Sequence, residues 1–330
     1  MLLKKPTILI ISPMLAKANN GNWQTARRWA DILQPHYDVQ CLLDWNVQTS
    51  PAPDMLIALH ARRSAPTIAA FADAFGGMSP KRPLVLILTG TDLYRDIRTD
   101  ALAQRSLELA THLVVLQPAG LEELTPSLRS KAHVIFQSAP RPAHPPATTN
   151  DRQYQVIMIG HLRAEKRPDT FMQAASLITN GKMKLLHIGG ALDSALGDMA
   201  AHTDASVERY TWLGPLSHEQ TLEQLYSSAL MVISSEMEGG ANVIIEAMVG
   251  GVAVLASDIP GNRGMLGEDY AGYFPVGDAP VLAHLIDRAA SDIAFQDLLA
   301  MQCARRAELF APAHEQAAVL KLADNYGLRV

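Results

Sequence analysis

The chain has 330 residues, of which 48% are hydrophobic and 18% are charged, and its formal net charge is −5. This composition is typical of an ordinary globular protein, and the lack of any run of like charge argues against a nucleic-acid-binding surface. The two cysteines, Cys41 and Cys303, fit neither a metal-ligand spacing nor a paired redox motif. A chain of this length usually forms two domains of roughly 150 residues each.

The N-terminus superficially resembles a signal peptide, because Lys4 and Lys5 precede the apolar stretch from Ile8 to Leu15. However, the short β-rich run from Thr7 to Ser12 is followed by a polar loop and an amphipathic helix, as a first parallel strand requires. No segment approaches the roughly 20 apolar residues that span a bilayer. We therefore expect a cytoplasmic protein without a membrane span.

Short apolar runs alternate with helical patterns in the first half of the chain. Runs of this kind, unbroken by polar alternation, predict strands that helices cover on both faces, as in a doubly wound parallel sheet. The predicted strands are Thr7–Ser12, Val39–Leu43, Met55–His60, Leu84–Thr89, Leu113–Gln117 and Val134–Ser138. A helix around Thr25 to Leu33 is expected after the first strand.

A proline-rich stretch from Pro140 to Asp151 predicts an extended connector. After it the alternation restarts, with strands predicted at Gln155–Ile159, Leu185–Gly189, Tyr210–Gly214, Leu230–Ser234, Val252–Ala256 and Gly272–Pro275. We expect an N-terminal domain at residues 1–145, a C-terminal domain at 146–312 and a C-terminal helix within 313–330. Because ligands of open α/β sheets bind at the carboxyl ends of the strands, the two domains are expected to face each other across one cleft.

A strand, a loop and a helix meet around a glycine pair, Gly239 and Gly240. The glycines allow a ligand to approach the backbone, and the helix that begins at Asn242, which this residue or its neighbour can cap, offers N–H groups to a diphosphate. Glu246 lies one turn further on, where a carboxylate can hold the two hydroxyls of a ribose. Glu238 can bind sugar hydroxyls or balance positive charge at the anomeric carbon. Alternatively, Glu246 is a solvated helix residue and Glu238 a loop carboxylate.

Two glutamates separated by seven residues, the glycine pair and the strand after Gly250 resemble the signature of family-4 glycosyltransferases of the GT-B fold. The loop from Gly160 to Pro168 is similar to that family's loop after the first strand of the C-terminal domain. The resemblance implies that Arg163 and Lys166 grip the donor diphosphate, so that fixed cations stabilise the leaving group without a metal ion. Alternatively, both side chains are solvated in a basic loop.

The resemblance also implies two Rossmann-like domains, an acceptor side at the N-terminus and a nucleotide-sugar side at the C-terminus. It implies that the last helix, from about Ala313 to Tyr326, crosses back to the N-terminal domain, and that Trp212 to Leu216 holds the donor base. Alternatively, the segment from Trp212 to Leu216 is a buried strand followed by a turn. His60 would contact the donor sugar, although a histidine at a strand end is more often structural. The segment from Asn19 to Thr25 takes the place of the family's glycine-rich loop. It contains one glycine, Gly21, where the family commonly has two.

Together these assignments define the predicted site. The predicted catalytic residues are Glu238, Arg163, Lys166 and His60. The predicted substrate-binding residues are Gly21, Asn22, Thr25, Thr91, Asp92, Gly160, Leu216, Gly239, Gly240, Ala241, Asn242 and Glu246. No cofactor and no metal ligand is expected, since the sugar nucleotide is a substrate and no Asp-x-Asp pair lies where a donor-bound cation would be held.

Several further stretches are similar to one subfamily, the selenosugar synthases of selenoneine biosynthesis. They are Asn20–Trp23, Thr25–Ala30, Ala58–Ala65, Leu88–Ile97, Gly239–Asn242 and Pro260–Gly264. This resemblance implies that a UDP-sugar, UDP-N-acetylglucosamine or UDP-glucose, glycosylates selenophosphate with formation of a carbon–selenium bond and release of UDP. An anionic acceptor needs cations, and the candidates are Arg27, Arg28, Arg62, Arg63 and Arg95.

Other interpretations remain open at this point. Thr91 and Asp92 are candidates for the acceptor side, but a turn capped by Thr or Asp explains them equally well. A transferase with a hydroxyl acceptor, a sugar-nucleotide epimerase and a non-catalytic sugar-nucleotide-binding protein are the rival functions. The sequence does not indicate the sugar, the anomeric outcome or the oligomeric state.

Overall fold

The computed structural model of the chain describes residues 5–14, 21–76, 82–142 and 154–324. It divides into two units by contact: the first comprises Met1–Ser138, Glu238–Gly240 and Pro312–Val330, and the second comprises Ala139–Met237 and Ala241–Ala311. Within the described ranges, none of the helices has the length and apolar character needed to cross a membrane. The predicted limits at residues 145 and 312 stay a prediction, since residues 143–153 lie outside the described part.

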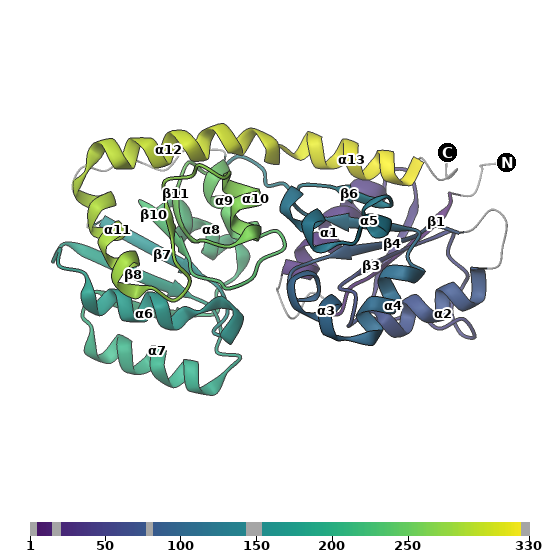
Figure 1. The fold of residues 1–330 in the computed structure, drawn as a ribbon, viewed down its shortest axis with the longest axis horizontal. Coiled ribbons are helices and arrows are strands. Elements are labelled where there is room, and N and C mark those ends of the chain that lie inside the picture. The colour runs from purple at the N-terminus through teal and green to yellow at the C-terminus, as the bar shows by residue number, and fades with distance from the viewer. Residues whose placement is uncertain (1–4, 15–20, 77–81, 143–153, 325–330) are drawn as a thin grey trace. The chain divides into compact units, whose positions relative to one another are not determined.

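The first unit is built on one parallel sheet of six strands (Figure 1). In sheet order these are β2 (Asp38–Leu42), β1 (Thr7–Ile11), β3 (Met55–Leu59), β4 (Leu84–Leu88), β5 (His112–Val115) and β6 (Ala132–Val134). The chain proceeds from β1 to one side and then returns to β3 on the other side. This reversal at β1 is the topological switch at which ligands bind in open α/β sheets.

Helices cover both faces of this sheet because its central strands are apolar on both faces. Ile8 and Ile10 of β1 pack toward α1 (Gly21–Leu33) and α13 (Pro312–Asp324), whereas Leu9 and Ile11 pack toward α2 (Ala65–Phe75) and α4 (Ala101–Leu109). This alternation follows from the two-residue period of a strand. Shorter helical segments of the unit are the π-helical turn η2 (Asp92–Asp96), α3 (Ile97–Thr99), η3 (Pro118–Glu123) and α5 (Pro126–Arg129).

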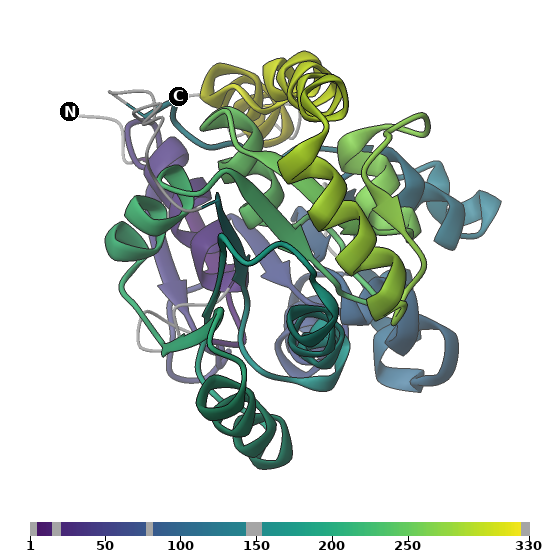
Figure 2. The same ribbon diagram turned by 90° about the vertical axis from the view of Figure 1, so that its left-hand side faces the viewer.

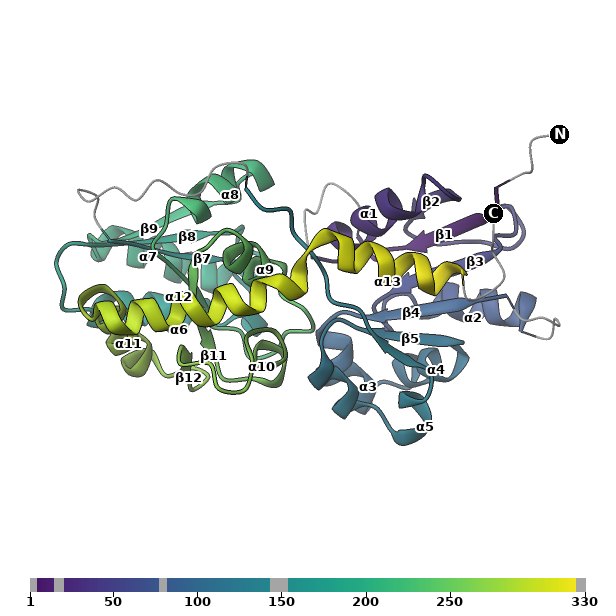
Figure 3. The ribbon, with the colours of Figure 1, turned by 90° about the horizontal axis from the view of Figure 1, so that it is seen from above.

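The last helix, α13, lies beside α1 (Figure 3), and a buried carboxylate joins the two helices. Glu315 of α13 accepts hydrogen bonds from Nε of Arg28 at 2.7 Å, from the indole N–H of Trp29 at 2.9 Å and from the hydroxyl of Ser138 at 2.6 Å. Three donors compensate the cost of burying this charge. The last helix therefore belongs to the first unit, and Arg28 serves this contact.

The second unit repeats the plan with a second parallel sheet of six strands. In sheet order these are β12 (Tyr273–Phe274), β11 (Ala253–Ser257), β10 (Leu230–Ile233), β7 (Tyr154–Ile159), β8 (Met183–Ile188) and β9 (Tyr210–Gly214). The chain runs outward from β7 through β8 to β9 and then crosses back to β10. The switch point lies between β7 and β10, whose carboxyl ends are therefore neighbours.

Helices lie on both faces of the second sheet (Figure 2). One group that packs together is α6 (Pro168–Leu177), α7 (Ser194–Ser206) and α11 (Ala279–Ser291), and the other is α8 (His218–Tyr226), α9 (Asn242–Val249), α10 (Pro260–Leu266) and α12 (Ile293–Ala307). Two single turns complete the unit, η4 (Ala164–Lys166) and η5 (Glu308–Phe310). The prediction of two doubly wound parallel sheets is confirmed.

Two local predictions were wrong. The strand predicted at Val134–Ser138 is β6 at Ala132–Val134, because the chain leaves the sheet after Ile135, whose N–H is bonded to the Val115 carbonyl. The side chains of the next residues bind α1 and α13 instead. Asn242 does not cap α9: it is the first helical residue, and Ala241, which has no capping side chain, precedes it.

Candidate functional site

The two motifs of the second unit lie side by side at the carboxyl ends of β7 and β10. The hydroxyl of Ser234, directly after β10, lies 2.9 and 2.8 Å from the carbonyl oxygens of Lys166 and Arg167. The N–H of Glu236 donates to the carbonyl of Glu165 at 3.0 Å. These bonds join the loop after β10 to the loop after β7. The sheet topology therefore brings together the segments that sequence analysis assigned to the donor.

A close backbone packing forms the base of this region. The Cα of Gly189, after β8, lies so near Gly160 that an added Cβ would stand 1.9 Å from the Gly160 carbonyl oxygen, and its φ is +156°. Only glycine fits there. The indole N–H of Trp212 donates to the Gly189 carbonyl at 2.8 Å, which ties β9 to the same point.

His161, to which sequence analysis gave no role, belongs to this region. Its Nδ1 lies 3.1 Å from the N–H of Gly190 and accepts its hydrogen bond, which leaves the ring proton on Nε2. Burial lowers the pKa of His161, and the positive charges of Arg163 and Lys166 lower it further. The histidine is therefore held neutral beside an electropositive loop.

Arg163 carries the clearest sign of a ligand. Its Nε is buried, and across the described residues it has no hydrogen-bond partner. A buried charged donor without a partner is costly, so such a group favours an anion that completes its bonding. The stem of Lys166 passes beside Gly160, with its Cγ and Cδ 3.8 Å from the position of an added Cβ. By contrast, Arg167 binds both carboxylate oxygens of Asp169 and serves the loop itself.

Glu246 lies on α9 with its side chain only 14% exposed. Its Oε1 lies 2.9 Å from Nε2 of His218, the first residue of α8. Sequence analysis did not identify His218, because no spacing along the chain links it to Glu246. Leu216, predicted to lie near the donor base, is half-buried after β9, whose last residue Gly214 has a φ of +67°.

In the first unit, His60 follows β3 in a left-handed conformation with a φ of +72°, which is unusual for a residue other than glycine. Its Nε2 lies 3.1 Å from the hydroxyl of Thr91, and its Nδ1 lies 3.4 Å from the N–H of Arg63. Burial lowers the pKa of His60, and the charges of Arg63 and Arg62 lower it further against the opposing effect of nearby carboxylates. A strained, buried and neutral histidine thus lies at the carboxyl edge of this sheet.

Asp92 caps the turn after β4. Its carboxylate accepts hydrogen bonds from the N–H groups of Ala61, Thr89 and Gly90 at 2.9, 2.9 and 3.0 Å, and it is fully buried. This is the behaviour of a turn-capping residue, the alternative that the sequence left open. A direct contact between Asp92 and a ligand stays a prediction.

Two of the five candidate arginines converge on one carboxylate. Nε of Arg62 lies 3.0 Å from Oδ2 of Asp96, and Nε of Arg95 lies 3.1 Å from Oδ1. Both arginines keep about two-fifths of their side chains exposed, whereas Asp96 is buried. The trio has a net charge of +1 beside His60, whose Nε2 is 3.9 Å from Oδ2 of Asp96. Arg27, in contrast, faces solvent 4.0 Å from Asp31.

The remaining predicted residues divide between the two units. Thr25 is buried in α1, where its hydroxyl donates to the Gly21 carbonyl at 2.9 Å and is also bonded to the Gln137 amide. Asn22 is half-buried in the same helix, and Asn19 and Asn20 lie outside the described residues. Glu238, Gly239 and Gly240 group with the first unit, and Ala241 and Asn242 with the second.

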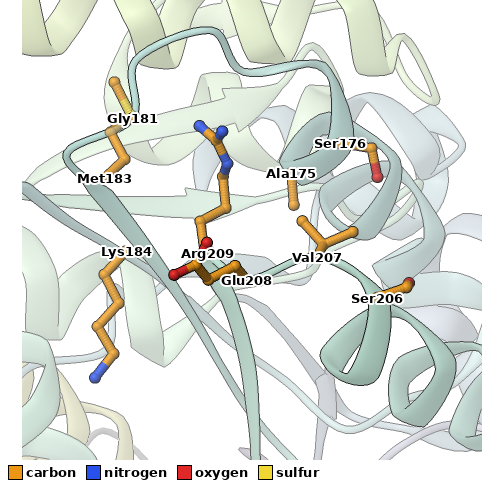
Figure 4. A pocket seen from close by; sticks show the side chains of 9 residues that line it. All are labelled: Ala175, Ser176, Gly181, Met183, Lys184, Ser206, Val207, Glu208 and Arg209. Atoms are coloured by element: carbon orange, nitrogen blue, oxygen red, sulfur yellow. The ribbon is translucent and has the colours of Figure 1, made fainter.

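A separate hollow of about 620 Å³ lies at the opposite edge of the second sheet (Figure 4). It is lined by residues at the starts of β8 and β9 and at the end of α7, including Lys184, Glu208 and Arg209. Ligands of parallel sheets bind at the carboxyl ends of the strands, which are at the other edge. This hollow is therefore not the candidate donor site.

Two doubly wound parallel sheets with joined loops at a switch point define the architecture of a GT-B glycosyltransferase. The chain belongs to the glycosyl transferases group 1 family, whose model matches residues 141–307, and it is therefore a glycosyltransferase enzyme. A comparison with curated protein sequences found no match.

Solved structures with the same fold have low sequence identity to this chain. Sucrose-phosphate synthase from Thermosynechococcus elongatus has a TM-score of 0.76 at 15% identity, with 98% of each chain covered. HepE from Anabaena, solved in complex with UDP and glucose, has a TM-score of 0.75 at 15% identity, covering 97% of this chain and all of HepE. TarM of S. aureus, solved with UDP, has a TM-score of 0.63 at 15% identity, and this chain spans only 56% of its length.

Proposed function

We propose that this glycosyltransferase takes a hexosyl group from a UDP-sugar and transfers it to selenophosphate. The observation that carries the donor half is the buried Nε of Arg163, which has no partner among the described residues and stands in the loop after β7. A diphosphate would complete its hydrogen bonding. The HepE structures with UDP and with UDP-glucose, which have the same fold, support a uridine nucleotide in this chain.

The leaving group explains why cations are needed at this loop. When the bond between the anomeric carbon and the diphosphate oxygen breaks, UDP leaves with the electron pair, and its negative charge grows. Arg163 and Lys166, together with N–H groups at the start of α9, would stabilise that charge. We therefore propose that the transfer needs no metal ion and no cofactor.

The acceptor half of the proposal rests on the subfamily resemblance and on the trio of Arg62, Arg95 and Asp96. Two half-exposed guanidinium groups with one carboxylate leave a net positive charge that suits a small oxyanion. The selenium atom of selenophosphate would attack the anomeric carbon, forming the carbon–selenium bond as UDP leaves. Because selenium is already a nucleophile, alignment supplies most of the catalysis. The roles of His60 and Glu238 toward the sugar, and a cytoplasmic location, stay predictions.

The test is mass spectrometry of the purified protein with UDP-N-acetylglucosamine or UDP-glucose, selenophosphate and a chelator. The expected result is a selenium-containing sugar that appears with UDP only in the complete mixture. A product that forms only with a hydroxyl acceptor would contradict selenophosphate as the acceptor and would leave the UDP-sugar donor in place. UDP release without any acceptor would indicate an epimerase or hydrolase, and failure to bind or turn over any UDP-sugar would overturn the donor assignment.

A further inference from the structure

Two neighbouring helices of the second unit hold a hydrogen-bonded histidine–glutamate pair beside the donor loops. Nε2 of His218, at the start of α8, lies 2.9 Å from Oε1 of Glu246 on α9. The histidine side chain is 47% exposed and the glutamate side chain 14%. The carboxylate is thus mostly withdrawn from water, while the imidazole that binds it reaches solvent.

The helices hold this pair in a defined place. Ser217 and Gln220 form a capping box, with each side chain bonded to the other residue's N–H, and this box sets the backbone at His218. At the other end of α8, the ring of Tyr226 packs so closely on Gly250 that an added Cβ would stand 2.2 Å from it. The relative position of α8 and α9 is therefore fixed at both ends.

The hydrogen bond from His218 determines the orientation of the Glu246 carboxylate. A carboxylate has two oxygens, and the final torsion of a glutamate side chain is broad, so a single fixed donor decides how the group faces. His218 occupies Oε1. Tyr226 is also within electrostatic reach, because the charge of Glu246 adds to burial in raising the pKa of the tyrosine hydroxyl.

We propose that His218 is a positioning residue for the nucleoside of the donor: it holds Oε1 of Glu246, so that Oε2 is oriented to accept a ribose hydroxyl. This inference rests on the proposed UDP-sugar donor. His218 makes the contact through the carboxylate rather than by touching the reacting atoms. Loss of the imidazole frees the carboxylate to rotate, which weakens recognition of the ribose hydroxyls and leaves the chemical step intact.

The experiment compares binding of UDP and of 2′- and 3′-deoxy-UDP by calorimetry, together with donor KM and kcat. His218→Ala is expected to raise the Kd for UDP about fivefold to tenfold, because it weakens the ribose hydrogen bond to Glu246 without removing that bond. Its preference for UDP over the deoxynucleotides falls, donor KM rises and kcat is unchanged. His218→Gln, whose amide can donate to Oε1, restores most of both the affinity and the preference.

The controls separate this role from a structural one. His202→Ala removes an exposed histidine from α7 and is expected to leave affinity and preference unchanged. Glu246→Gln is expected to abolish the preference for the ribose hydroxyls. If Glu246→Gln has that effect while His218→Ala retains the full preference, or binds UDP more tightly, the inference is wrong and the donor proposal stands. If the unaltered protein binds no UDP, both are overturned.

Discussion

Polar side chains near the carboxyl edges of the two sheets differ in how far the protein satisfies their hydrogen bonding. In the first unit the carboxylate of Asp92 accepts three backbone N–H groups, and the hydroxyl of Thr25 is bonded to Gly21 and Gln137. In the second unit the loop after β7 leaves Nε of Arg163 buried, with no hydrogen-bond partner among the residues that the structure describes. The family model matches residues 141–307, which is nearly all of the second unit and, of the first unit, only Glu238–Gly240. The comparison indicates that the loop after β7 suits the anion proposed as its ligand, whereas Asp92 in the first unit holds its own turn.

The largest expected effect tests the second edge. Arg163→Ala, and separately Lys166→Ala, should reduce kcat by about 100- to 1,000-fold, the usual cost of removing a donor that stabilises developing negative charge. Steady-state assays of UDP release measure this, with Lys184→Ala at the opposite edge of the sheet as the matched cation control. Turnover by both variants within a factor of about three of the unaltered protein would contradict the assignment.

The next largest effect concerns Asp92, whose carboxylate is hydrogen-bonded within the first unit. Asp92→Ala removes the acceptor of three backbone N–H groups in a buried site, so the free energy of unfolding should fall by about 3 to 4 kcal/mol. Urea denaturation measures the loss. We expect the KM for the acceptor to be unchanged in the molecules that remain folded, because the carboxylate of Asp92 binds backbone N–H groups of the turn rather than the acceptor. A change in acceptor KM without a loss of stability would instead assign Asp92 to the ligand.

A pH effect follows from His187 beneath the donor loops. Burial lowers its pKa to about 4 in the folded chain, below the value of about 6.5 for an unfolded histidine. The unfolded state therefore binds more protons between these values, so stability is full above pH 6.5 and falls by roughly 2 to 3 kcal/mol as the pH is lowered to 4. Denaturation across this window should show a shallower fall for His187→Gln. Equal slopes for both proteins would contradict a buried neutral histidine.

The smallest effect concerns the acceptor. Arg62→Ala and Arg95→Ala should each raise acceptor KM about tenfold and leave donor KM unchanged, since each removes one cation from a half-exposed cluster. Arg27→Ala, which removes a solvated arginine of α1, is the control and should have no effect. An increase of the same size in the KM for the donor would instead assign this arginine cluster to donor binding.

Several elements were predictable from local pattern. Strands such as Met55–Leu59 and Leu84–Leu88 are short, apolar and flanked by helical periods, which predicts a two-sided parallel sheet without any tertiary knowledge. The same holds for Arg163 and Lys166, because a loop that directly follows a strand must lie at the carboxyl edge. β6 was misplaced because the apolar pattern continues past the point at which the chain leaves the sheet.

Contacts between residues far apart in the chain could not be predicted in this way. Glu315 is an unremarkable helical glutamate in the sequence, yet it lies under Arg28 and Trp29, which are nearly three hundred residues away. His218 and Glu246 are 28 positions apart, on different helices. Their pairing depends on how α8 and α9 pack on the sheet.

The sequence by itself determined the class of fold, the order of its elements and the loops that bear the donor-binding groups, because periodicity and loop position are local properties of the chain. The tertiary structure decided which candidate side chains are bonded to the protein, as Asp92 and Arg28 are, and that Nε of Arg163 has no hydrogen-bond partner in the described part of the chain. The reason is physical: a polar side chain is available only if packing brings it no partner, and packing depends on the whole fold.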